Sequence, residues 1–158
     1  MAENYLRMLI ESQEKKLRLL KEAERLDEEM MNLMLEENPD LEKLEKNLAE
    51  KGKIVGDLDA LDDGFEAVYG KIRDELAEHK ELYREEIRKL KEQISDITEE
   101  TVKIRAMEER NRAAVEKFFA DRKKKLREGK SSVKIANAYA MSMRRVNQVD
   151  SFFVDKKK

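Results

Sequence analysis

The feature that most constrains this chain is a long series of apolar positions separated by alternating steps of four and three residues. The series runs through Tyr83, Ile87, Leu90, Ile94, Ile97, Thr101, Ile104, Glu108, Asn111, Val115 and Phe118. Such spacing forms a continuous seam along one side of an α-helix and is typical of helices that pack lengthwise in coiled coils. It predicts a helix over roughly 83–125. The polar exceptions, Glu108 and Asn111, are interpreted as a register-setting or partly exposed pair and not as a catalytic site.

The first forty residues carry a second apolar stripe, and its end is well marked. Apolar residues at helical spacing predict a helix from Glu3 to about Glu37. Asn38 is then expected to cap a second helix. Pro39 is expected at the first position of that helix, where its missing amide hydrogen costs nothing. A tight reversal here would make the first two helices antiparallel neighbours.

The end of the second helix is open. Apolar spacing continues from Ile54 to Leu76 without a change of register, whereas Asp62, Asp63 and Gly64 are typical of a break. A continuous helix, a kink and a short connecting helix all fit this pattern. We expect the helix over 83–125 to pack along the first helix in each case.

Composition supports an all-helical class. Charged residues make up 44% of the 158 residues and hydrophobic residues 40%, which suits narrow apolar stripes better than a wide globular core. The periodicity of the apolar residues favours ordered helices over disorder. The predicted fold class is all-α: an elongated antiparallel helical hairpin or bundle with coiled-coil packing and a weakly helical C-terminal tail.

Charge divides the chain into an acidic body and a basic tail. From Asp121 onward there are twelve Lys and Arg against four Asp and Glu, a net of +8, which leaves 22 against 32, or −10, upstream. Beyond Lys125 the apolar pattern fades and then returns weakly. We therefore predict a coiled-coil body over 1–128 and a basic, conditionally ordered, partner-binding tail over 129–158. The tail lacks the aromatic and basic motifs of nucleic-acid-binding modules, so no nucleic acid is expected as partner.

No residue pattern for catalysis, metal or cofactor binding emerges, so none of the three is predicted. There are no cysteines, and His79 lies in a highly charged stretch where a solvent-facing side chain is expected. Asp57 to Val68 fails as a calcium loop because Leu61 and Val68 occupy ligand positions. Charges interrupt the first twenty residues too often for a signal or membrane segment. The predicted localisation is cytoplasmic.

Five residues form the candidate partner-binding surface: Phe118, Phe119, Ile135, Tyr139 and Met143. Phe118 and Phe119 must point about 100° apart on a helix, so one of them is available to a partner. Ile135, Tyr139 and Met143 recur every four residues. They form an apolar stripe too short to be stable alone, which a partner helix could complete.

Several segments resemble FlgN-type flagellar export chaperones, sometimes labelled FliT-like. They are YLRMLIESQEKKLRLLKEAERLDEEMMNLM, EKGKIVGDLDALDDGFEAVYGKI, IRAMEERNRAAVEKFFADRKKKL and SSVKIANAYAMSMRRVNQVDSFFVDKKK. The more telling features are Asn111 within ERNR and the aromatic pair before the final DKKK. The resemblance spans nearly the whole chain.

The resemblance implies a helical cytoplasmic chaperone that binds hook-associated proteins of the hook-filament junction before their export through the flagellar type III apparatus. It implies that residues 113–143 capture helices of these clients and that Tyr139 is the nearest candidate for contact with the export gate. The alternatives are a structural coiled-coil scaffold or a subunit like the export-ATPase stalk, and a nucleic-acid binder acting through the basic tail. The residues leave the client open, and both a monomer and a homodimer fit the pattern.

Overall fold

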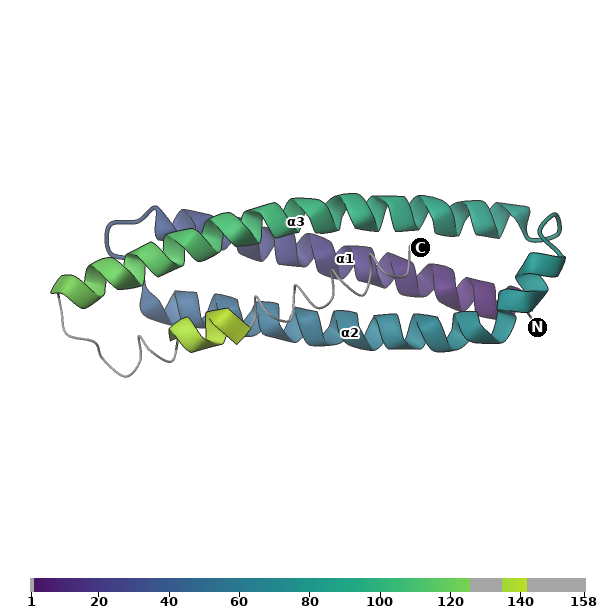
Figure 1. Ribbon diagram of the computed structural model, residues 1–158, viewed down its shortest axis with the longest axis horizontal. Coiled ribbons are helices and arrows are strands. Elements are labelled where there is room, and N and C mark those ends of the chain that lie inside the picture. The colour runs from purple at the N-terminus through teal and green to yellow at the C-terminus, as the bar shows by residue number, and fades with distance from the viewer. Residues whose placement is uncertain (1, 126–134, 142–158) are drawn as a thin grey trace.

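The structure is a computed structural model that describes residues 2–125 and 135–141. These residues form three long helices, α1 (Ala2–Met34), α2 (Leu41–Glu78) and α3 (Arg84–Lys125), and a short helix over 135–141. The long helices lie side by side in one elongated bundle, and the short helix lies near the end of the bundle where α3 finishes (Figure 1). No strand occurs among these residues. The all-α class is confirmed.

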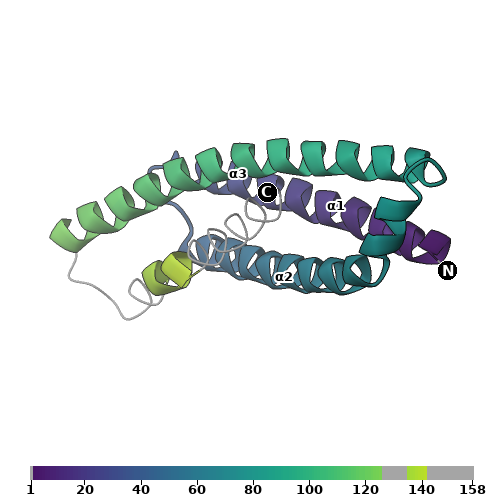
Figure 2. The same cartoon turned by 45° about the vertical axis from the view of Figure 1, so that its right-hand side comes forward.

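Helix α1 is the common neighbour of the other two. It packs against α2 and also against α3, and both views show it between them (Figure 2). The chain reverses direction between α1 and α2 and again between α2 and α3, so consecutive helices are antiparallel. The expected packing of the third helix along the first is confirmed.

The reversal between α1 and α2 differs in detail from the prediction. Helix α1 ends at Met34, and the residue that caps α2 is Asp40, whose Oδ1 accepts a hydrogen bond from the Glu42 amide at 2.9 Å. The predicted cap at Asn38 and the predicted helical Pro39 are wrong by two positions. Asp and Asn are both good caps, and the buried Pro39 places its rigid ring just before the helix.

Helix α2 is continuous through Gly64, so neither a break nor a connecting helix occurs there. Leu58, Ile72 and Leu76 remain buried on both sides of this point. The second reversal comes at 79–83, where the amides of Leu82 and Tyr83 both donate to the carbonyl of His79. Within α2, the apolar periodicity therefore outweighed the local turn signal of Asp62, Asp63 and Gly64.

The core consists of three apolar clusters along the bundle. The N-terminal end of α1 contributes to the first, made of Ala2, Leu6, Leu9, Ile72, Leu76, Tyr83 and Leu90. The middle cluster comprises Leu20, Leu26, Ile54, Leu58, Ile97 and Ile104. The cluster at the other end comprises Met30, Leu33, Leu44, Leu48, Val115, Ile135 and Tyr139. None of the described helices has an apolar stretch long enough to cross a bilayer.

Candidate functional site

Three charged side chains, one from each long helix, meet inside the bundle beside the last of these clusters. Lys51 Nζ of α2 donates to Asp27 Oδ1 of α1 at 3.0 Å and to Glu108 Oε1 of α3 at 2.7 Å. The exposed fractions of the three side chains are between 0% and 3%. We refer to Asp27, Lys51 and Glu108 as the charge cluster. It joins α2 to α3 directly.

Two amide side chains fasten the surroundings of the charge cluster to α1. Asn47 Nδ2 donates to the carbonyl of Leu26 at 2.8 Å, and Asn111 Nδ2 donates to the carbonyl of Asp27 at 2.9 Å. Asn47 and Asn111 are almost fully buried. A buried amide that reaches a specific backbone atom fixes the alignment of two helices, because any slip leaves it without a partner.

The charge cluster contains one more acid than base. Asp27 Oδ2 and Glu108 Oε2 are buried and have no hydrogen-bond partner. Burial raises the pKa of Asp27 to about 8; the neighbouring Glu108 carboxylate adds to the rise, and Lys51 opposes it. Both carboxylates contact the same ammonium group, so a proton bound between them would satisfy the two orphaned oxygens. The raised pKa of Asp27 favours the protonated form of this carboxyl at neutral pH.

The short helix over 135–141 covers this region. Ile135 and Tyr139 are 1% and 3% exposed, and both belong to an apolar cluster with residues of α1, α2 and α3. Their spacing of four places them on the same side of the helix. The segment therefore docks on the body through an isoleucine and a tyrosine.

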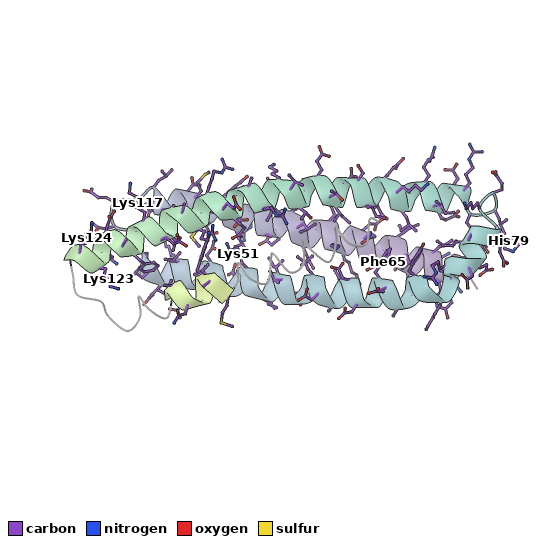
Figure 3. All side chains as sticks on the ribbon, in the orientation of Figure 1. Lys51, Phe65, His79, Lys117, Lys123 and Lys124 are labelled. Carbon is purple, nitrogen blue, oxygen red and sulfur yellow. The ribbon has the colours of Figure 1, made fainter. Side chains whose placement is uncertain are left out.

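Tyr139 also makes polar contacts with the charge cluster. Its hydroxyl donates to the backbone carbonyl of Glu108 at 3.1 Å, and Lys51 Nζ lies 5.2 Å from the centre of its ring. That distance is within the range of a cation–π interaction. Burial, with the charge of Glu108 second, raises the pKa of Tyr139 far above its usual range, so the phenol stays protonated. Along the length of the bundle, Lys51 and the short helix lie at about the same position (Figure 3).

The adjacent phenylalanines at the end of α3 differ in their surroundings. Phe119 packs against the cluster that contains Val115 and Tyr139. Phe118 lies further out, with its ring edge-on to Phe119 at 5.2 Å and under the Arg122 guanidinium at 5.1 Å. The expectation that Phe118 closes the seam is wrong. In a straight helix the seven-residue repeat drifts by about 20° per heptad, and this drift brings Phe119 inward instead.

Of the five predicted surface residues, the structure thus brings Phe119, Ile135 and Tyr139 together, with Phe118 at the rim. Met143 lies outside the described residues, as does most of the predicted tail. From the sequence, a partner helix was expected to complete the stripe of Ile135, Tyr139 and Met143, but Ile135 and Tyr139 pack in a cluster with residues of the chain's own long helices. Partner binding by these residues stays a prediction.

Sequence reasoning missed most of the buried polar groups. The partly exposed reading of Glu108 and Asn111 is wrong, since each is 2% exposed. Asp27 and Lys51 were not singled out, although both occupy steps of three and four in their own apolar stripes. The missed signal was charges of opposite sign at seam positions of different helices.

The residues considered as metal ligands, His79 and the acidic residues of the rejected calcium loop, lie apart from the charge cluster. His79 is exposed at the end of α2, as expected, and Figure 3 shows it at the far end of the bundle from the short helix. Asp62, part of the rejected calcium loop, contacts Lys16 instead. Over 2–125 and 135–141, no group of three or more acidic or histidine side chains is arranged to bind a metal ion.

Comparison with known proteins adds no further assignment. No family model matches the chain, and neither the curated proteins nor the solved structures contain a significant match.

Proposed function

We propose that this chain is a cytoplasmic holding chaperone of flagellar export, which binds helices of hook-associated proteins and keeps them from polymerising before secretion. The resemblance of its sequence to FlgN-type chaperones supports this proposal. So does the way in which the long helices accommodate a short one. Capture of an amphipathic helix on an apolar surface is a recurring mode of recognition and needs neither nucleotide nor metal.

The docking of the segment 135–141 on the three long helices is the observation that carries the proposal. Two anchors four residues apart, Ile135 and Tyr139, make the buried contacts. A helix of this length is not stable in water on its own, so its order depends on the surface beneath it. A client helix with an aliphatic and an aromatic residue four apart would make the same kind of contacts, beside this segment or in its place.

Exposed apolar side chains near the docked segment add area for a client. Met31, Leu35 and Met141 are 42%, 79% and 55% exposed. Met31 lies near the C-terminal end of α1 and Leu35 just beyond it, close in sequence to Met30 and Leu33, which pack in the cluster with Ile135 and Tyr139. Methionine side chains adapt to partners of different shape. This end of the bundle is thus the part of the described surface best suited to a second helix.

The fold does not favour the alternative of a long stalk like the export-ATPase subunit, whereas the alternative of a coiled-coil scaffold stays open. The chain reverses twice, at 35–40 and at 79–83. After each reversal the next helix, α2 or α3, packs along α1. A stalk formed by two long antiparallel helices would expose the third apolar stripe, which is buried in this bundle.

The test is direct binding of the full chain to each hook-associated protein of its own host cell. We expect a defined complex by size-exclusion chromatography with light scattering, and suppression of client polymerisation. Changing Ile135 and Tyr139 together to Ser should lower client affinity by about ten-fold or more, because the docked segment that they anchor is part of the predicted partner-binding surface. The control Met8→Ser, at an exposed position near the opposite end, should leave affinity unchanged. If none of the hook-associated proteins of the host forms a complex with the chain, the proposal is wrong.

A further inference from the structure

The docked segment and the charge cluster are in contact, and this contact has a consequence for proton binding. Tyr139 donates to the Glu108 carbonyl and places its ring over Lys51. An aromatic ring against an ammonium group takes the place of water on that side of the group. Departure of the segment would open this side to solvent.

We propose that docking of the segment 135–141 is coupled to the uptake of one proton by the charge cluster, so that the segment is a latch that loosens as pH rises. This inference does not rest on the chaperone function. It follows from three geometric facts about the described residues: two carboxylates share one lysine, each has an orphaned oxygen, and a tyrosine ring lies against the shared lysine.

The groups that face the charge cluster come from every element around it. Helix α2 supplies Lys51, and α3 supplies Glu108 together with Arg112 and Glu116, which act on Tyr139 from the exposed side. The docked segment supplies Tyr139. Among these groups and those of the cluster, Asp27 of α1 has a pKa that burial raises into the range between pH 7 and pH 9, to about 8.

The sign of the coupling depends on whether Asp27 is more easily protonated in the docked state or in the open state. With the segment docked, burial and the second carboxylate raise the pKa of Asp27 to about 8. When water reaches the cluster, the penalty for the charged form falls, and so does the pKa. The docked state thus binds the proton more tightly than the open state. Docking is fully favoured below the pKa of the open state and weakens as pH rises through the pKa of the docked state.

The experiment is amide hydrogen exchange of the full chain at pH 7 and pH 9, corrected for the intrinsic pH dependence of exchange. In the wild type, protection of the amides in 135–141 should fall about ten-fold across this interval, because the pKa of Asp27 in the docked state lies near its middle, at about 8. Circular dichroism at both pH values verifies that the long helices stay folded. The same fall should persist in Tyr139→Phe, because the phenol is not the titrating group.

Matched variants assign the proton to the charge cluster. Asp27→Asn has the size of the protonated acid and no charge at any pH, so its protection over 135–141 should change less than two-fold. Glu108→Gln should also lose most of the dependence and serves if Asp27→Asn does not fold. Asp62→Asn, which alters the other buried ion pair, should keep the ten-fold fall.

Two results would overturn the latch. One is a wild-type protection over 135–141 that is the same at both pH values. The other is protection in that segment equal to that of the most protected amides of α1, since the segment would then open only when the whole bundle unfolds.

Discussion

Two buried sites join the long helices by charge, and they are built differently. At one, Lys16 of α1 contacts Asp62 of α2 at 2.5 Å, and the side chains are 1% and 8% exposed. At the other, Lys51 of α2 contacts Asp27 of α1 and Glu108 of α3. We call the first the one-to-one site, after the ammonium and the carboxylate that meet there across two helices. The second, the two-to-one site, matches one ammonium with two carboxylates across three helices.

The difference shows how the number of acids at a buried site decides its chemistry. A one-to-one contact is neutral when both groups are charged and needs no proton to be stable. A two-to-one contact has a surplus negative charge, which is expensive to bury, and it therefore raises a carboxyl pKa. The docked Tyr139 lies over the two-to-one site. We therefore expect proton binding and segment docking to be coupled at that site.

The largest effect should come from removing the shared lysine. Lys51→Met deletes hydrogen bonds to two deeply buried carboxylates and should lower the free energy of unfolding by about 3–5 kcal/mol. Lys16→Met is the matched change at the other site and should cost less, because Asp62 is nearer to solvent than Asp27 or Glu108. Urea unfolding followed by circular dichroism at pH 7 measures both. An equal or smaller loss for Lys51→Met would contradict the comparison.

The next effect is the dependence of overall stability on pH. The pKa of Asp27 is raised to about 8 in the folded chain, so the folded state binds this proton more tightly than the unfolded state. Stability should therefore fall as pH rises, by on the order of 1 kcal/mol per pH unit between pH 5 and pH 8. Urea midpoints across this range measure the slope.

The matched controls for that slope are Asp27→Asn and Asp62→Asn. The first removes the titrating carboxyl and should flatten the profile, whereas the second should keep the wild-type slope. A wild-type midpoint that rises with pH in this interval would show that the surplus acid is not protonated in the folded chain.

The arrangement of the long helices could largely be predicted from the sequence. The long helices, their antiparallel order and the packing of α3 on α1 all follow from apolar steps of three and four, which record burial along whole helices. The sequence left the junction at Gly64 open, and the structure shows that the helix continues there, in keeping with the periodicity and against the local signal of Asp62 and Asp63. Long-range patterns average over many residues and tolerate single exceptions.

The candidate site was harder to predict because its contacts join residues far apart in sequence. Lys51 meets Glu108 across 57 positions and Tyr139 meets the Glu108 carbonyl across 31. A stripe indicates which side of a helix is buried but not which residue lies opposite. Ile135 and Tyr139 were found by their spacing, yet whether they face the body or a partner depends on a surface that three helices create together.

A smaller effect should come from the tyrosine hydroxyl. Tyr139→Phe keeps the ring over Lys51 and removes the bond to the Glu108 carbonyl, so docking should weaken by about 1 kcal/mol. Hydrogen exchange over 135–141 at pH 7 measures this change. Tyr83→Phe is the control: its hydroxyl reaches Glu75 at a longer 3.4 Å in a partly buried place, so the loss should be smaller. If Tyr139→Phe and Tyr83→Phe lose the same stabilising free energy, the hydrogen bond from Tyr139 to the Glu108 carbonyl is not specifically important for docking.

The smallest expected effect concerns Gly64, two residues beyond the one-to-one site. It is exposed within α2, its φ is not positive, and a Cβ added there would meet no atom within 4 Å. Alanine has a better helix propensity than glycine, so Gly64→Ala should stabilise the bundle by about 0.5–1 kcal/mol. The urea midpoint at pH 7 measures it.

This last change tests whether the Lys16 and Asp62 contact depends on a flexible point in α2. If the contact sits on a regular helix, the gain from alanine should be the same in the wild type and in Lys16→Met, because the two changes then act independently. A loss of stability in Gly64→Ala, found with Lys16 present and absent without it, would mean that the helix must bend near Gly64 for Asp62 to reach its lysine. The one-to-one site would then impose strain on α2, and the simple contrast between a passive ion pair and a proton-binding cluster would fail.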